Sequence, residues 1–193
     1  MAWVEQLRSC IDWSEGDRAR LAEVRDLLDS RREETVETLG EQLVALNGTQ
    51  ALMTNTRFAR RLHSVLTNWL MGLLDGAFDE EYVERRRALG QELADLDLTF
   101  EHVILLESIM RQQVFELAQK GLNAQPERLS TVMHTLDKAL RRDLVFIYEG
   151  YLDFRDAKME QSLLDRFLTI TGFSPTLYDS LAEAWRWEHE QGD

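Results

Sequence analysis

Apolar residues recur at steps of three and four between residues 129 and 154, and this period constrains the fold more than any other feature. Such a period places the apolar side chains along one face of a helix. Pro126 suits the first turn of this helix, which is predicted to run past Lys158. Its apolar positions are Leu129, Val132, Met133, Leu136, Leu140, Leu144, Ile147, Tyr151 and Phe154. So long an apolar face needs other helices to cover it, and the chain is predicted to be all-α.

Capping residues and glycines divide the preceding chain into shorter predicted helices. The first of these helices is predicted to start at Ser14 or Asp17. The last three helices have the predicted N-caps Thr56, Asp79 and Thr99. Strand-like alternation of β-branched residues is nearly absent, which agrees with the all-α prediction. The predicted helices cover residues 14–29, 31–46 (stopped by Asn47-Gly48), 56–75, 79–97 and 99–121.

The chain changes character after residue 160. Gly172 interrupts the helical pattern, and Ser174-Pro175 begins a short predicted helix with apolar residues at helical spacing. We therefore expect one domain over residues 1–160 and a short C-terminal helical extension over residues 161–193. The extension packs back on the domain, contacts a partner or leads into a further segment, and the residues do not choose among these.

Charge and composition exclude several classes of function. With 22 basic and 35 acidic residues the net charge is -13, which repels a phosphate backbone and argues against nucleic-acid binding. The sequence lacks a run of about 18 apolar residues and a basic-then-apolar leader, so we expect no membrane insertion and a cytoplasmic location. The single cysteine, Cys10, excludes an internal disulfide and most cysteine-based metal sites.

Motifs of known active sites are missing from the sequence. The four histidines are His63, His102, His134 and His189; none follows a glutamate at the di-iron spacing, and no two are four residues apart. Phosphate-binding glycine loops and nucleophile elbows are also absent. The run Arg85 to Arg87 is interpreted as a helix surface that pairs with nearby acids. We therefore expect neither an enzyme nor a metal site.

One stretch of the sequence, from Trp69 to Arg111, points to a family. It contains a Trp-Leu pair, a glycine, an aromatic-Asp turn, a tyrosine, an arginine-rich helix, an apolar-Gly pair and a leucine before the next long helix. In this order and spacing the chain resembles the globin-coupled sensors and protoglobins of bacteria and archaea, over roughly residues 12–157. The resemblance implies a globin-like fold of the sensor-globin type. The motif residues are Trp69-Leu70, Gly76, Phe78-Asp79, Tyr82, Arg85 to Arg87, Leu89-Gly90 and Leu98.

The resemblance also identifies the position where iron is ligated. In haem-binding members, the third residue after the Ile-Gly pair is the proximal histidine, and here that position is Leu93. A leucine has no lone pair to offer iron, so no haem and no other cofactor is expected. His63, six residues before Trp69 on the helix that the resemblance places on the distal side, is the best substitute ligand.

Haem-free relatives suggest what such a chain does. The sequence resembles the N-terminal domains of stressosome regulators and small sensor proteins that inhibit sporulation kinases, which use a haem-free globin fold as signal-input modules. We therefore expect a haem-independent sensory or regulatory domain whose apolar pocket is filled by side chains or by a small apolar ligand. The predicted pocket residues are Phe58, Leu62, Leu66, Leu89, Leu93, Val103 and Met110.

The last two long helices are apolar on more than one face. Either both faces are buried within a larger monomer, or the helix pair forms a four-helix bundle with a second subunit. We predict the homodimer, together with a signalling protein as a further partner. The predicted interface residues are Leu136, Leu140, Leu144, Ile147 and Tyr151.

Two other functions remain open at this point. The first is a haem-based gas sensor with a non-standard ligand such as His63. The second is a structural adaptor whose pocket is a filled core. The sequence does not name the signal, the downstream partner or the role of residues 161–193.

Overall fold

The computed structural model describes residues 2–45 and 55–190, and the side chains of residues 3–45 and 55–185. Its described residues are helical apart from turns and short connections, as predicted. The helices form two compact units, Met1–Phe154 and Arg155–Asp193, and the division falls within the longest helix. The helices are α1 (Ala2–Cys10), α2 (Glu15–Asp29), α3 (Arg32–Val44), α5 (Thr56–Leu73), α6 (Glu80–Asp95), α7 (Phe100–Leu122), α8 (Pro126–Thr171) and α9 (Pro175–Glu190).

Most predicted helix starts agree with the structure. Asp79 caps α6 by accepting a hydrogen bond from the backbone N–H of Tyr82, and Thr99 precedes α7. The start of α5 is a correction, because its cap is Asn55 rather than Thr56. The Asn55 side-chain oxygen accepts hydrogen bonds from the backbone N–H groups of Arg57 and Phe58 in the first turn, and asparagine is a favoured N-cap residue. The predicted stop at Asn47-Gly48 lies outside the described residues.

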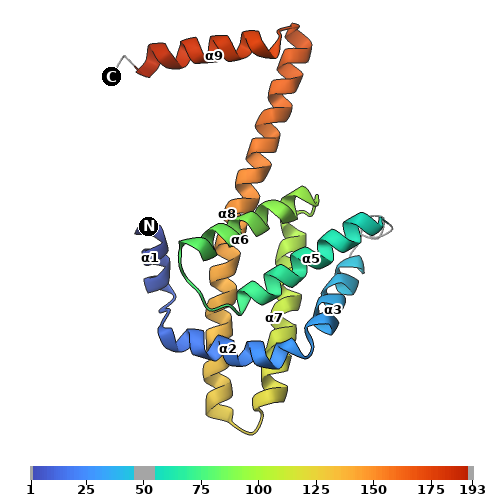
Figure 1. The fold of residues 1–193 in the computed structure, drawn as a ribbon, viewed down its shortest axis with the longest axis vertical. Helices are drawn as coiled ribbons and strands as arrows, with labels where there is room; N and C mark the ends of the chain where they lie inside the picture. The colour runs from blue at the N-terminus through green and yellow to red at the C-terminus, as the bar shows by residue number, and fades with distance from the viewer. Residues whose placement is uncertain (1, 46–54, 191–193) are drawn as a thin grey trace. The chain divides into compact units, whose positions relative to one another are not determined.

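The first unit is built around α7 and the first part of α8, which run side by side in opposite directions (Figure 1). Helices α2 and α3 pack against α7, and α5 packs against α3 and α6. Their inward faces form one large hydrophobic core, with α2, α5, α6, α7 and α8 all contributing fully buried leucines or valines. This arrangement gives the apolar face of α8 its cover from within the same chain.

Helices α6 and α8 touch backbone to backbone. A Cβ added at Gly90 of α6 would fall closer than 3.0 Å to the carbonyl oxygen of Ile147, and one at Gly150 of α8 would do the same to Arg87. The two helices therefore approach more closely than side chains normally permit, because each has a glycine at the crossing.

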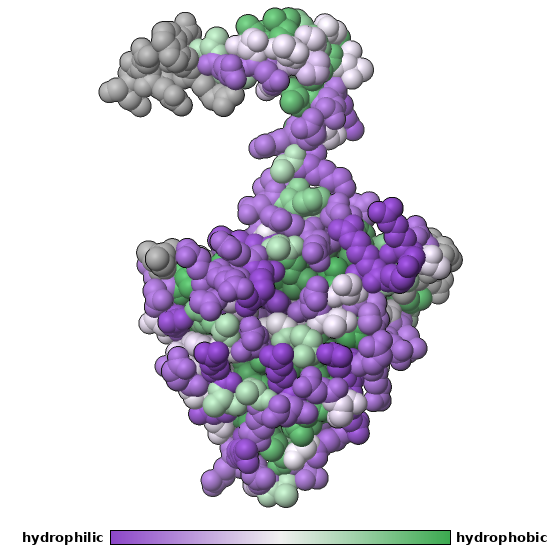
Figure 2. All heavy atoms as spheres, in the orientation of Figure 1, coloured by the Kyte–Doolittle hydropathy of each residue, from purple (hydrophilic) through white to green (hydrophobic). Residues whose placement is uncertain are grey.

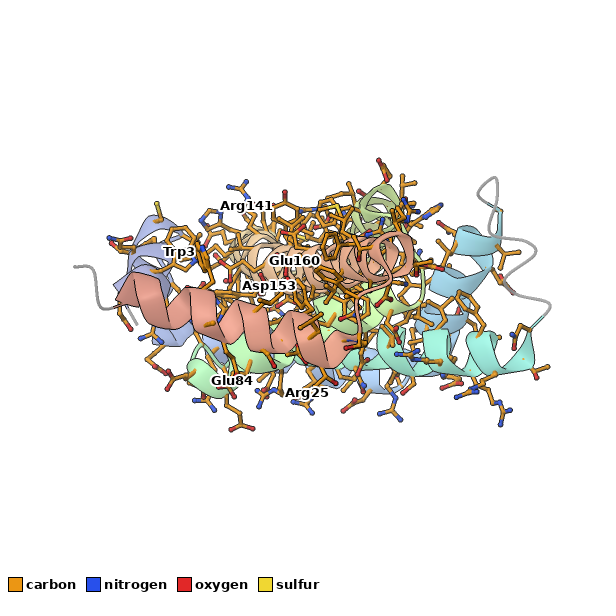
Figure 3. All side chains as sticks on the ribbon, turned by 90° about the horizontal axis from the view of Figure 1, so that it is seen from above. Trp3, Arg25, Glu84, Arg141, Asp153 and Glu160 are labelled. Atoms are coloured by element: carbon orange, nitrogen blue, oxygen red, sulfur yellow. The ribbon has the colours of Figure 1, made fainter. Side chains whose placement is uncertain are left out.

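Helix α1 has no counterpart among the predicted helices. Leu7 is buried in a second, smaller apolar cluster with Phe78, Tyr82 and Phe146. Trp3, labelled in Figure 3, donates its indole N–H to Glu149 of α8. Apolar residues at helical spacing in the first eleven positions were the signal for this helix.

A buried carboxylate joins α2 to α8. Asp17 accepts hydrogen bonds from the Ser14 backbone N–H at 2.9 Å and from the Thr135 hydroxyl at 2.7 Å, and it lies 3.3 Å from the Lys138 ammonium. Burial by itself would raise the pKa of Asp17, but these hydrogen bonds and the charge of Lys138 lower that pKa to about 2.

We expect this carboxylate to make folding depend on pH. Because the folded pKa lies below the usual 3.8, Asp17 stabilises the fold above that pH and loses its contribution as the pH falls to about 2. The unfolding free energy of the wild type should exceed that of Asp17→Asn by an amount that shrinks by about 2 kcal/mol over this interval. Urea unfolding at several pH values measures the difference. Asp26→Asn, at an exposed position of the same helix, is the matched control, and a difference that does not vary with pH would contradict the prediction.

The second unit consists of the end of α8, from Arg155, and α9. Gly172 has a φ of 72° and ends α8, and Ser174 precedes α9, so the break and the helix start agree with the sequence. The predicted domain boundary after residue 160 lies inside α8, six residues beyond the division between the units. Among the described residues, every helix is too short or too polar to cross a lipid bilayer.

Candidate functional site

Leu93 lies on α6 at the centre of the first unit. Its side chain is fully buried, with 0% exposed, and it belongs to the large hydrophobic core. The close crossing at Gly90, one turn earlier, holds this part of α6 against α8. Leu93 is therefore fixed in the interior by the backbone contact beside it.

The other predicted pocket residues are distributed over the helices around this core. Leu62 and Leu66 come from α5, Leu89 comes from α6, and α7 supplies Val103 and Met110. These five side chains are buried in the same core as Leu93, and Phe58 is half-buried and packs against it. The structure therefore places all seven residues in or against one apolar core, and their role as a ligand pocket stays a prediction.

The histidines lie away from this core or near its edge. His63, the substitute ligand, places its Nε2 3.0 Å from a carboxylate oxygen of Glu33, and the side chains are 42% and 69% exposed. His102 uses Nδ1 to cap the first turn of α7 at Thr99, at 3.2 Å from the backbone nitrogen. His134 is exposed, and the side chain of His189 lies outside the described part of the chain.

The hydroxyl groups of two buried tyrosines also form hydrogen bonds within the chain. The Tyr151 hydroxyl donates to the Leu98 carbonyl oxygen at 2.9 Å, and the Tyr82 hydroxyl donates to Asp143. Burial, followed by the neighbouring Asp143 charge, raises the pKa of Tyr82 well above its usual value. The Tyr82 phenol therefore keeps its proton, and both hydroxyl groups act as hydrogen-bond donors.

A buried ionic network lies beside the core, between α5, α6 and α8. Arg86 and Asp143 form an ion pair at 3.3 Å, and Arg86 also donates to the backbone carbonyl of Trp69. The guanidinium carbon of Arg142 lies 4.2 Å from the ring centroid of Trp13 and 4.1 Å from that of Tyr82. Stacking against these two aromatic rings offsets the cost of burying the Arg142 cation, which has little direct pairing with a carboxylate.

The network corrects one interpretation made from the sequence. Arg85 is on the surface as predicted and contacts Glu81 at 2.6 Å, whereas Arg86 is buried. The spacing in the sequence could have indicated that Arg86 is buried, because Arg86 lies in the helical register of Tyr82 and Leu89 on the inward face of α6. An arginine in an apolar stripe indicates a buried counter-charge elsewhere in the chain.

The predicted dimer contacts also need correction. Leu136, Leu140 and Ile147 have 0% of their surface exposed and Tyr151 has 5%, because the core of the same chain covers them. These four are core residues, and a second subunit cannot touch their side chains; Leu144 is half-buried. Periodicity identified the buried face of α8 but not what buries it.

Exposed large apolar residues of the first unit gather on the same helix pair. Apart from Trp3 on α1, those found among the described residues lie on α7 and α8. They are Ile104, Leu105, Tyr148 and Leu152. Charged side chains such as Glu84 of α6 instead point outward from the ribbon (Figure 3).

Residues 1–156 match the Protoglobin family. The chain belongs to the protoglobin family. The match covers the whole first unit of this protoglobin, and it ends two residues beyond the division within α8.

Solved structures support the fold of this protoglobin. It is similar to the globin domain of a Geobacter sulfurreducens globin-coupled sensor, with a TM-score of 0.69 and 16% sequence identity. The similarity covers 76% of this chain and 96% of that domain. At this identity the likeness shows the globin fold only. The search of curated proteins gave no match.

Protoglobins normally bind haem, which needs a side chain that donates a lone pair to iron inside the core. The position that the sequence resemblance assigns to the proximal histidine is the buried Leu93, and the ring nitrogen of His63 faces Glu33. The described residues therefore do not supply a fitting histidine ligand. Among them, no group of three or more histidine, cysteine or acidic side chains is placed to hold a metal ion.

Proposed function

We propose that this protoglobin is a haem-independent sensory or regulatory domain that acts in the bacterial cytoplasm through dimerisation and partner binding, without enzymatic activity. The observation that carries the proposal is the fully buried Leu93 at the proximal position. An apolar side chain there offers no bond to iron and occupies volume beside a haem plane. The family match supports the sensory part of the proposal.

We expect the protein, expressed with added haem and then gel-filtered, to keep no stoichiometric Soret absorbance. His63→Ala should give the same spectrum as the wild type, because the His63 ring faces Glu33 at the surface. Absorption spectra of both proteins measure this. A sharp Soret band that disappears in His63→Ala would replace the proposal with the haem-based gas sensor, which the family membership favours.

A structural adaptor with a filled core is the remaining alternative. It predicts that no ligand co-purifies and that Leu93→Ala only destabilises the fold, by about 2–5 kcal/mol. Mass spectrometry of gently denatured protein distinguishes the adaptor from a ligand-binding sensor. A reproducible stoichiometric lipid would support the sensor and contradict the adaptor.

The dimer is proposed to form through the exposed face of α7 and α8, which carries Ile104, Leu105, Tyr148 and Leu152. An exposed apolar patch that is concentrated on two adjacent helices is typical of a protein interface. A packed interface of this kind has discrete arrangements, so a signal would pass as a small shift between the paired helices.

We expect Leu105→Glu to convert the dimer into a monomer, because the interface would bury an unpaired charge from each subunit. Light scattering coupled to gel filtration at micromolar concentration should show the mass fall from two chains to one chain of 22.5 kDa. Ala22→Glu, at an exposed position of α2, is the control and should stay dimeric. A wild type that is already monomeric would contradict the dimer.

A further inference from the structure

A groove of the first unit lies between α1 and the start of α6, with a cavity volume of about 360 Å³. We call it the α1–α6 groove. Phe78 and Val83 are buried and form its floor, whereas Trp3 and Glu84 are exposed at its edges (Figure 3). The groove therefore combines an apolar floor with one aromatic and one acidic edge. The residues that define it are Trp3, Val4, Phe78, Glu80, Val83 and Glu84.

The aromatic edge of the groove is held in place although it is exposed. Glu149 of α8 accepts the indole N–H of Trp3 at 3.0 Å, and its second oxygen accepts two hydrogen bonds from Arg87 of α6. Figure 2 shows mostly hydrophilic residues on the visible face of the first unit. Trp3 is 49% exposed and, outside α7 and α8, is the one large apolar side chain found exposed among the described residues of this unit. An ordered, exposed tryptophan is typical of a binding surface.

The acidic edge keeps a repulsion within α6. Glu80 and Glu84 are one helical turn apart, and among the described residues neither forms an ion pair. Like charges at this spacing destabilise a helix. The neighbouring residues at the same spacing, Glu81 and Arg85, attract each other and meet at 2.6 Å. A cation bound in the groove would relieve the repulsion that α6 retains on this side.

The arginines that line the groove do not neutralise this edge. Arg87 is paired with Glu149, which lies outside the groove lining, and Arg8 lies 3.6 Å from Glu5. Four carboxylates and two guanidinium groups line the groove in all, so its charge is negative. An acidic segment, a phosphate backbone or an anionic lipid surface would therefore be repelled.

We propose that the α1–α6 groove binds a basic amphipathic segment of a partner protein. An apolar side chain of this segment fills the floor over Val83. The stem of a lysine or arginine lies along Trp3, and its charged end reaches Glu84. The inference rests on the partner binding of the proposed function, because it gives that binding a surface and a partner chemistry.

Selection from a random library tests the chemistry of the partner. Phage-displayed peptides of about 16 residues, long enough for four helical turns, are selected on the immobilised full chain at about 0.15 M salt. The enriched peptides should carry lysine or arginine beside large apolar residues. Enrichment of acidic or uncharged peptides, or no enrichment, would overturn the proposal.

Fluorescence anisotropy of an enriched, labelled peptide tests the location. Glu84→Lys should weaken binding at least about tenfold, because it places a cation against the cation of the peptide. Glu92→Lys is the matched control: it lies on the same helix, is exposed, is absent from the groove lining and changes the net charge equally. Glu92→Lys should bind nearly as well as the wild type. Equal losses in the two variants would show diffuse attraction to an acidic protein and overturn the groove.

Exchange of charge separates a direct contact from a loss of folding. A peptide whose basic residues are replaced by glutamate should bind the Glu84→Lys protein more tightly than it binds the wild type. Trp3→Ala should weaken the unaltered peptide several-fold while the circular dichroism spectrum stays that of the wild type. If the exchanged peptide does not regain binding, the contact with Glu84 is overturned.

Failure of the docking site and failure of the proposed function give different results. If the protein retains no haem and Leu105→Glu makes it monomeric, but Glu84→Lys leaves peptide binding unchanged, the α1–α6 groove alone is overturned. If a stoichiometric Soret band appears or the wild type is monomeric, yet Glu84→Lys weakens binding and Glu92→Lys does not, the docking site stands without the proposed function.

Discussion

Replacing Gly90 with alanine is expected to destabilise the first unit by at least about 3 kcal/mol. The added Cβ would overlap the carbonyl oxygen of Ile147 and approach the backbone nitrogen of Tyr151. Both are backbone atoms of α8, so no side-chain rotation can relieve the overlap, and the two helices must separate. Separation would loosen the core around Leu93, which follows Gly90 by one turn.

Thermal and urea unfolding of Gly90→Ala, read by circular dichroism, measure the loss. Gly150→Ala should behave alike, because its Cβ would overlap the backbone at Arg87. Gly40→Ala is the control: a Cβ at this helical glycine of α3 meets nothing within 4 Å, and alanine should stabilise the helix by about 0.5–1 kcal/mol. A Gly90→Ala protein as stable as the wild type would show that the helices do not meet at this glycine.

Asp143→Asn should cost about 3–5 kcal/mol of unfolding free energy, because it removes the buried carboxylate that balances Arg86 and lies beside Arg142. Asparagine has nearly the same shape, so the loss comes from charge rather than packing. Two buried guanidinium groups would then remain with no anion in the network.

Urea unfolding of Asp143→Asn beside Asp95→Asn isolates the effect of burial. Asp95 pairs with Arg61 at 2.7 Å, but both side chains are 45% exposed, so its loss should cost less than about 1 kcal/mol. Arg86→Gln should cost less in the Asp143→Asn background than in the wild type, because the two residues share one interaction. Additive losses would contradict the network.

Local patterns in the sequence were enough to predict most helices. The start of α2 followed from Ser14 and Asp17, and that of α9 from Ser174-Pro175, because capping is a short-range interaction. Helix α1 was missed although its apolar residues have helical spacing, and its apolar face packs on residues far along the chain, such as Phe146. The spacing of apolar residues and the capping residues show that a helix exists, but they do not show which part of the chain it packs against.

The site was predictable only in part, for the same reason. The resemblance located Leu93, and the burial of this side chain agrees with an interior position. The pairing of Arg86 with Asp143 joins residues 57 positions apart, and no local rule connects them. The assignment of Ile147 to an interface failed because an apolar stripe looks the same whether its own chain or a second subunit covers it.

The glycine crossing of α6 and α8 has a consequence for signalling. Between most helices, side chains change rotamer and absorb small displacements, but here the two backbones meet with nothing compressible between them. Whatever fills or empties the space around Leu93 and moves α6 must therefore move the segment of α8 at Ile147, whose next residue, Tyr148, lies on the proposed dimer face. In the proposed haem-independent function, any occupant that displaces α6 would move α8 through this same backbone contact.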